Sequence, residues 1–296
     1  MRRIAVLLIL ICFMAMIPFC AEGETLLQSP VAEGWEFVVG IDATGHAVAA
    51  GDNTYGQCDV ADWENLVSVA AGREHVIGLC EDGTVRFAGS NEYGQGDVEQ
   101  WESIVMIAAN YHNSYGLTAD GRILCAGYNN SHAPESFACV ASWTDVVWLA
   151  ANTKWGVCAI DARGHILTWD TQDYEHENEH DYDCVTDPVQ AVMEPFGFIA
   201  LQSDGTVVEY EGILHAKEGK GVMVNVYEGY TIIVYDDGHV HVNEALGAQN
   251  AWENIKWADG HFAITRDGRY VSRYCLDPKE KLQEILDDYM AHELGK

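Results

Sequence analysis

The sequence predicts an all-β protein built from copies of one short unit. One copy opens at Trp63 with WENLVSVAAGREHVIGLCEDGTVRFAGSNEYGQGDV, and the next opens at Trp101, 38 positions later, with WESIVMIAANYHNSYGLTADGRILCAGYN. Half a copy precedes them over residues 38–60. Seven units that close into a ring would form a seven-bladed β-propeller. A tight turn that ends in glycine recurs at Gly45, Gly83, Gly121, Gly164, Gly205, Gly238 and Gly268.

Each unit is expected to supply at least three strands. In the copy that opens at Trp63 these cover residues 66–70, 75–80 and 84–88, and Asp82-Gly83 forms the hairpin between the second and third. The second strand is apolar almost throughout, which is typical of a strand covered on both faces. Four tryptophans at one repeated place are interpreted as wedges between blades: Trp63, Trp101, Trp143 and Trp252.

The later units are shorter than the earlier ones. The intervals that end at Gly205, Gly238 and Gly268 are 41, 33 and 30 residues long. Seven blades are therefore expected, with six as the alternative. The repeats begin halfway through a unit, so we expect the N-terminal strand to complete the last blade and close the ring.

The two ends of the chain are expected to lie outside the propeller, which we place at residues 34–274. After it, Asp277-Pro278 predicts the start of a C-terminal α-helix over residues 277–294, packed on the rim of the propeller. Residues 1–23 have the charged, apolar and small-residue regions of a secretory signal peptide. Their apolar run, residues 4–19, is shorter than the roughly 20 residues of a membrane-spanning helix.

Export follows from that signal. We expect a protein that is secreted or held at the cell surface, with no membrane contact beyond the signal peptide. Cys20 follows Phe19, whereas lipid-modified cysteines usually follow a small side chain, so lipid attachment is the less favoured alternative.

The composition disfavours several classes of partner. The chain carries 16 basic and 46 acidic residues, a net charge of -30. Nucleic acids and anionic lipid surfaces are bound mainly through Lys and Arg, so we expect no nucleic-acid partner. Self-repulsion and solubility are the simplest interpretation of the acidity, and a monomer is expected.

Metal and disulfide chemistry are not predicted. Nine cysteines are present, and the seven after residue 23 form no disulfide framework, although Cys139 and Cys184 are placed where they could pair. The insertion from Asp170 to Asp187, DTQDYEHENEHDYDCVTD, holds histidines and carboxylates that are possible metal ligands. It has no fixed ligand spacing, so a solvated loop is favoured, and we predict neither a metal nor a cofactor.

The repeated motif resembles that of a known family. The pattern W-x-x-[ILV]-V-x-[IV]-A-A-x-x-x-x-x-x-G-L-x-x-D-G, followed by A-G-x-N-x-Y-G-Q-x-D-V, resembles the regulator of chromosome condensation repeat. The resemblance extends from Val38 to about Arg273 and is strongest over residues 40–127. It implies a seven-bladed propeller. The short style of residues 50–57 is similar to that of bacterial secreted propellers that inhibit β-lactamases by binding through one face of the ring.

The turns between the first and second strands vary between units. They are enriched in aromatic, histidine and arginine residues, and they are expected at one end of a rigid scaffold. This composition is typical of a recognition surface, which Tyr55, Tyr93 and Tyr128 are expected to extend. The candidate binding residues are Trp35, Arg73, Tyr111, His112, Trp155, Phe196, Tyr230 and His261.

Two functions are carried forward. The favoured one is a secreted, non-enzymatic propeller that binds a protein or peptide partner, with inhibition of a secreted enzyme as its specific form. The alternative is a secreted lyase or hydrolase in which His112, His75 or His261 acts as acid or base at the mouth of the channel. The sequence contains no nucleophile elbow and no zinc-protease signature, so no catalytic residue is assigned.

Overall fold

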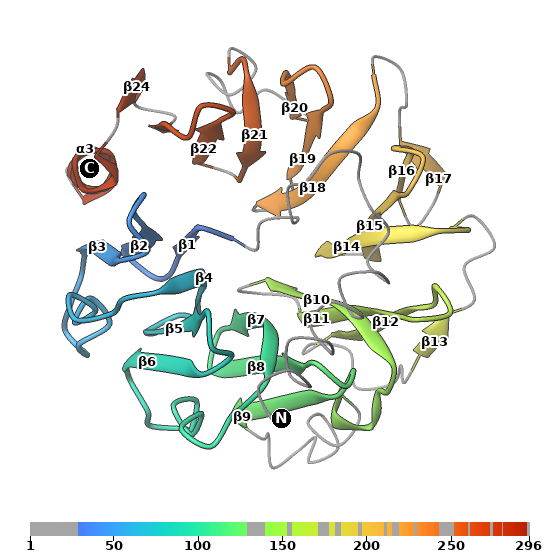
Figure 1. Ribbon diagram of the computed structural model, residues 1–296, viewed down its shortest axis with the longest axis horizontal. Helices are drawn as coiled ribbons and strands as arrows, with labels where there is room; N and C mark the ends of the chain where they lie inside the picture. Colours follow the sequence, from blue (N-terminus) through green and yellow to red (C-terminus); the bar gives the residue numbers. More distant parts are fainter. Residues whose placement is uncertain are drawn as a thin grey trace, which may run out of the picture.

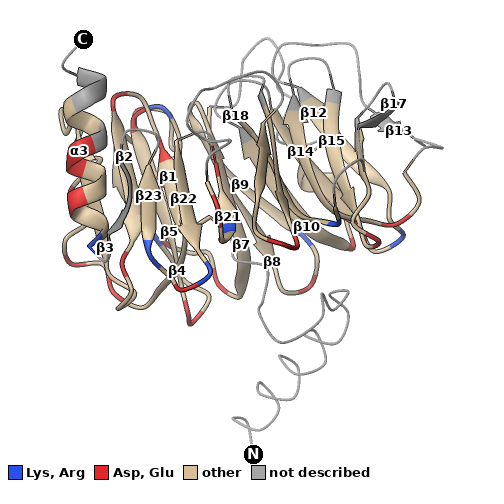
Figure 2. Cartoon of the chain, turned by 90° about the horizontal axis from the view of Figure 1, so that it is seen from above, with Lys and Arg blue, Asp and Glu red and all other residues tan. Residues whose placement is uncertain are grey.

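The protein is a ring of seven antiparallel sheets around a central axis (Figure 1). The computed structural model describes residues 29–128, 140–152, 156–170, 178–180, 185–194, 197–209, 212–214, 219–227, 230–242, 252–259, 261–272, 275–279 and 281–294. The ring is a short cylinder when it is seen from the side (Figure 2). The predicted seven-bladed β-propeller is confirmed, and the alternative of six blades is wrong.

Sheets 1 to 3 are the most regular part of the ring. Each has three strands in the described residues, and the first strand in sequence lies nearest the axis (Figure 1). These strands are β1 (Val31–Glu33), β2 (Phe37–Ile41), β3 (Ala47–Gly51), β4 (Leu66–Ala71), β5 (His75–Cys80), β6 (Val85–Gly89), β7 (Ile104–Asn110), β8 (Asn113–Thr118) and β9 (Ile123–Gly127).

Sheets 4 to 7 follow the same plan, and three of them have a fourth, outer strand. Their strands are β10 (Val146–Asn152), β11 (Gly156–Asp161), β12 (Ile166–Asp170), β13 (Asn178–His180), β14 (Pro188–Glu194), β15 (Gly197–Gln202), β16 (Val207–Glu209), β17 (Gly212–Leu214), β18 (Gly221–Tyr227), β19 (Tyr230–Tyr235), β20 (Val240–Val242), β21 (Ile255–Ala258), β22 (Phe262–Thr265), β23 (Tyr270–Ser272) and β24 (Cys275–Lys279).

The glycine of each hairpin recurs because the backbone there is left-handed. Gly83 has φ 82°, and its six counterparts lie between 81° and 90°. Residues with a Cβ atom are strained in this region. The hairpin between β5 and β6 is closed by the Gly83 N–H group, which donates to Cys80 O at 2.9 Å. The predicted hairpins and strands are thus confirmed.

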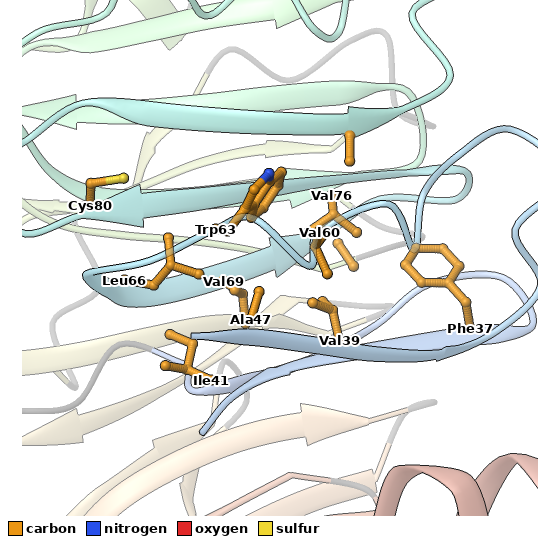
Figure 3. Packing of buried hydrophobic residues seen from close by; sticks show 12 residues of the cluster. Phe37, Val39, Ile41, Ala47, Val60, Trp63, Leu66, Val69, Val76 and Cys80 are labelled. Carbon is orange, nitrogen blue, oxygen red and sulfur yellow. The ribbon is translucent and has the colours of Figure 1, made fainter. Parts of the chain in front are cut away.

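Neighbouring sheets pack face to face through apolar side chains. Trp63 is 4% exposed and lies in a cluster contributed by sheets 1 and 2, together with Val39, Val69 and Val76 (Figure 3). Its ring lies over Gly78, where an added Cβ atom would come within 2.8 Å of the indole. Trp101 has the same relation to Gly116. The interpretation of these tryptophans as wedges between blades is confirmed.

The ring does not close in the way the sequence predicts. We expected the N-terminal strand to join the last sheet, but β1 pairs with β2, and β24 supplies the fourth strand of sheet 7. That prediction is wrong because the outer position is already taken by residues 275–279. Closure comes from an apolar cluster that joins sheets 1 and 7, and from Tyr270, whose hydroxyl donates to Ile41 O at 2.5 Å.

The C-terminal helix covers this seam. Helix α3 (Leu282–Leu294) lies beside β3 and the last sheet in Figure 1. Its buried residues Leu282, Ile285, Leu286 and Met290 belong to the closing cluster. The expected start at Asp277-Pro278 is wrong, since both residues lie in β24. The helix itself and its packing on the propeller are confirmed.

Several predictions fall on residues outside the described ranges. These are the signal peptide at residues 1–23, the pairing of Cys139 with Cys184, and most of the acidic insertion. In the part of the chain that the structure describes, no helix has the length and apolarity needed to cross a membrane.

Candidate functional site

The turns between first and second strands meet at one end of the ring. In sheets 1 to 3 they are joined by backbone hydrogen bonds, since Trp35 N–H donates to Arg73 O and Arg73 N–H donates to Tyr111 O, both at 2.9 Å. The loops that follow the third strands begin at the same end: Ser90 N–H donates to Glu74 O, and Tyr128 N–H donates to His112 O. We call these turns and loops of sheets 1 to 3, residues 34–37, 52–59, 72–75, 90–97, 110–113 and 128, the aromatic face.

The glycine hairpins lie at the opposite end, which we call the hairpin face. There Leu66 N–H donates to Gly45 O and Ile104 N–H donates to Gly83 O, so each hairpin holds the start of the next innermost strand. Because strands alternate in direction within each sheet, the hairpins and the variable turns are kept at opposite ends of the ring.

Arg73 is held between two aromatic rings on the aromatic face. Its guanidinium carbon lies 5.0 Å from the ring centroid of Trp35 and 5.0 Å from that of Tyr111. One of its N–H groups donates to the Tyr111 hydroxyl at 2.9 Å, and Nε is 3.5 Å from a carboxylate oxygen of Glu74. Cation–π contacts of this kind contribute about 0.5–1 kcal/mol at exposed sites. They fix three side chains from three consecutive sheets into one platform.

A second group of rings surrounds His112. The imidazole centroid is 4.5 Å from that of Tyr93, 4.8 Å from that of Tyr111 and 6.5 Å from that of Tyr128. Tyr93 and Tyr128 meet edge to face at 5.2 Å. Partial burial lowers the pKa of His112; the Glu74 carboxylate opposes this, and the Arg73 charge adds to it. At neutral pH His112 is therefore an uncharged part of the aromatic cluster.

These rings remain open to solvent. The exposed fraction is 56% for Trp35 and 50% for Tyr55, and it is 40–42% for Tyr93, Tyr111 and Tyr128. The other large apolar side chains that are exposed within the described residues are Val67, Val105 and Val147, near the starts of β4, β7 and β10. In the described part of the chain, the exposed large aromatic side chains thus gather on the aromatic face.

His75 lies below the surface. It is fully buried and stacks on Phe87, and its Nε2 is 3.1 Å from the hydroxyl of Ser114. Since Ser114 donates to Gln95 O at 2.8 Å, its oxygen accepts from His75 Nε2–H. Burial lowers the pKa of His75 to about 4. The residue fills the place that Phe37 occupies in sheet 1, and it is not positioned to meet a substrate.

His261 lies at the same end of the ring as the aromatic face but is buried in the seam between sheets 7 and 1. It is 4% exposed, and Nδ1 is 2.9 Å from both carboxylate oxygens of Glu33, so it joins sheet 7 to sheet 1. Asp259 accepts from the backbone N–H groups of His261 and Phe262 at 2.9 and 2.8 Å. Burial, and then the Glu33 carboxylate, raise the pKa of Asp259 to about 7. This group belongs to the seam of the ring.

Only some of the predicted binding residues come together in the structure. The structure brings Trp35, Arg73, Tyr111 and His112 together, and Tyr55, Tyr93 and Tyr128 lie on the same face as we expected. Trp155 and Phe196 lie outside the described residues. Tyr230 begins β19, where its side chain is not described.

Two features of the site were missed. The seam group of Glu33, Asp259 and His261 joins residues 228 positions apart, and no local pattern signals it. The hydrogen bond from Arg73 to Tyr111 joins residues 38 positions apart, the same spacing as Trp63 to Trp101, so the repeat period is a signal that could have found it. Within the described residues, no group of three or more His, Cys, Asp or Glu side chains is arranged to hold a metal ion.

Comparison with known proteins identifies the repeat. Residues 66–95 match the model of the Regulator of chromosome condensation (RCC1) repeat. The chain therefore contains an RCC1 repeat. These residues run from β4 into the loop that carries Tyr93, so this RCC1 repeat holds both a repeated hairpin and a piece of the aromatic face. No curated protein has a sequence that matches the chain.

Solved structures share the propeller fold at low sequence identity. Human WBSCR16 has a TM-score of 0.57 and 14% identity, over 75% of this chain and 77% of its own. The CRINKLY WD40 ectodomain of the Arabidopsis thaliana receptor kinase ACR4 has a TM-score of 0.56 and 12% identity, over 80% of this chain and 92% of its own. The ectodomain of the Physcomitrella patens receptor kinase CR4 has a TM-score of 0.57 and 12% identity, over 79% of this chain and 69% of its own. At these identities the likeness extends to the fold alone.

Proposed function

We propose that the protein is a non-enzymatic binding module that holds a protein or peptide partner on its aromatic face. The observation that carries this proposal is the platform of exposed rings, in which Trp35, Arg73 and Tyr111 brace one another across three sheets. Tyrosine, tryptophan and arginine dominate the binding energy of protein interfaces. Side chains that are already fixed lose little conformational entropy when a partner binds.

The enzymatic alternative has less support. Of its three candidate histidines, His75 is buried beneath the turn and His261 is bonded to Glu33 in the seam. His112 is enclosed by tyrosines, and within the described residues its imidazole has no hydrogen bond or ion pair with a carboxylate. A binding role uses the same residues without requiring a proton acceptor.

The test is capture of a partner with matched variants. Wild-type protein should retain a partner from the extracellular and cell-surface fraction of the native organism, and Trp35→Ala/Tyr111→Ala should lose it. Asp120→Asn/Arg122→Gln changes an exposed ion pair on the hairpin face and should bind as the wild type does. Equal retention by all three proteins would refute the proposal for this face.

Export and enzyme inhibition are the specific form of the proposal. The two arginines and the apolar run over residues 4–19 support secretion. If the captured partner is an enzyme, its activity should fall when the wild-type protein is added and not when the Trp35→Ala/Tyr111→Ala variant is added. Mass measurement of the mature chain checks export, since a cleaved signal peptide should remove about the first 23 residues. An intact N-terminus would contradict it.

A further inference from the structure

We infer that the aromatic face selects a partner segment rich in Lys and Arg; this inference rests on the proposed binding function. It comes from the charges that surround the exposed rings. Among the described residues of this face, the acidic side chains are Glu36, Asp52, Asp59, Glu74, Glu92 and Asp97, and the basic one is Arg73.

The charge of Arg73 is already used within the platform. Its guanidinium is stacked between two rings, bonded to the Tyr111 hydroxyl and 3.5 Å from Glu74. A partner therefore meets a face whose single cation, among the described residues, is paired. By contrast, Glu36 and Glu92 are exposed, and neither forms an ion pair within the described part of the chain. Their carboxylates are available to a cation.

The loop at residues 52–59 holds the carboxylate of Asp52 through its own hydrogen bonds. Asp52 accepts from the Thr54 hydroxyl at 2.6 Å and from the Gln57 amide at 2.9 Å. The hydrogen bond from Thr54 lowers the pKa of Asp52. Tyr55 stands in this loop, and Tyr93 stands in the equivalent loop beside Glu92 and Asp97. Each exposed ring of these loops thus has a negative charge close to it in sequence.

Three other arginines of the described residues lie at the opposite end of the ring. Arg122, Arg163 and Arg269 are in hairpins of the opposite face, where each is 2.8 Å from a neighbouring aspartate. In Figure 2 blue and red segments lie close together along the lower edge of the ring. These three arginines are paired with carboxylates of their own hairpins. The carboxylates of the aromatic face differ because they lie close in sequence to exposed aromatic rings.

Lys and Arg side chains fit this combination. A cation over the face of a tyrosine or tryptophan ring is attracted by the ring quadrupole, and exposed carboxylates can pair with the same cation. The net charge of -30 would also steer a basic segment toward the protein at low salt. An acidic segment would meet the exposed carboxylates of Glu36 and Glu92 and be repelled.

The experiment is a selection of short random peptides displayed on phage, with the full chain as target. Peptides that bind wild type but not Trp35→Ala/Tyr111→Ala should carry an excess of Lys and Arg over Asp and Glu. Neutral or acidic peptides with the same dependence on the rings would overturn the charge inference and leave the binding function intact. If every selected peptide binds the ring variant equally well, both proposals are overturned.

A matched pair of variants separates local charge from total charge. Glu36→Gln/Glu92→Gln and Glu81→Gln/Glu102→Gln each remove two exposed carboxylates, the first pair on the aromatic face and the second near the hairpin face. The Kd of a selected basic peptide should rise on the order of tenfold for the first variant and little for the second. Equal effects of the two variants would show that only net charge matters and would overturn the inference.

Discussion

The two ends of the ring use their side chains in different ways. On the hairpin face, polar side chains satisfy the backbone of their own turn: Asp42, Asp82, Asp204 and Asp237 each accept from the N–H group two residues later, at 2.8–3.0 Å. On the aromatic face of sheets 1 to 3, rings from different sheets contact one another and remain exposed. The hairpin aspartates and glycines that repeat stabilise the fold, whereas Trp35 and Tyr111, which vary between units, remain exposed on the aromatic face.

Two tryptophans give the largest test of this difference. Trp63 repeats and is 4% exposed, whereas Trp35 does not repeat and is 56% exposed. Trp63→Ala should lower the free energy of unfolding by about 3–5 kcal/mol, since it removes a buried ring and leaves a cavity between sheets 1 and 2. Trp35→Ala should change it by about 0.5 kcal/mol or less. Urea denaturation measures both, and similar losses would contradict the division of roles.

The seam provides a pH-dependent test. In the unfolded chain Asp259 loses its proton near 3.8, the ordinary pKa of an aspartate, but in the folded ring its pKa is about 7. The raised pKa contributes stability that is fully present below about pH 4. This stability is lost as the pH rises toward and through 7. Relative to wild type, Asp259→Asn should therefore stabilise the protein at pH 8, on the order of 1–3 kcal/mol.

The comparison of Asp259→Asn with wild type should be made at several pH values. The difference in melting temperature should be largest at pH 8 and should shrink toward pH 5. Asp82→Asn is the control, because hydrogen bonds from Thr84 lower the pKa of Asp82 and so give it the opposite sign of pH dependence. If the difference in melting temperature between Asp259→Asn and wild type is constant across this range, Asp259 does not have a raised pKa in the folded protein.

A single hairpin glycine gives the smallest expected effect. Gly83 has φ 82°, and an added Cβ atom would lie 3.2 Å from Ser103 Cα. Gly83→Ala should cost about 1–2 kcal/mol of stability through the left-handed backbone. Binding of a selected peptide should not change, because the hairpin lies at the far end of the ring. Weakened peptide binding, measured below the melting temperature, would show that the two ends are coupled.

The sequence predicted the parts of the molecule that depend on local rules. Hairpins at Asp-Gly, apolar second strands and wedge tryptophans follow from turn chemistry and from the alternation of buried positions. Trp35, Arg73, Tyr111 and His112 were predicted together because turns at equivalent places in a repeat must share one end of the ring. This reasoning needs only the period of the repeat.

Contacts between distant segments were not predictable in the same way. The strand at residues 275–279 has a weak pattern that contains Pro278, and proline there suggested a helix start. Its place at the outer edge of sheet 7 is compatible with proline, because an edge strand can leave one N–H position unused. His261, in the turn between β21 and β22, contacts Glu33, 228 positions away, and this contact depends on how sheets 7 and 1 pack together.

Ring closure without strand exchange has a consequence for how such a protein can change. Within the described residues, every sheet is made from consecutive strands of the chain, so duplication or deletion of a single repeat would add or remove a whole blade. Such a change would mainly strain the contact between the first and last blades beneath α3, because these two blades must still pack together for the ring to close. Variation in the turns would meanwhile proceed independently in each blade, and new specificities could arise without a new architecture.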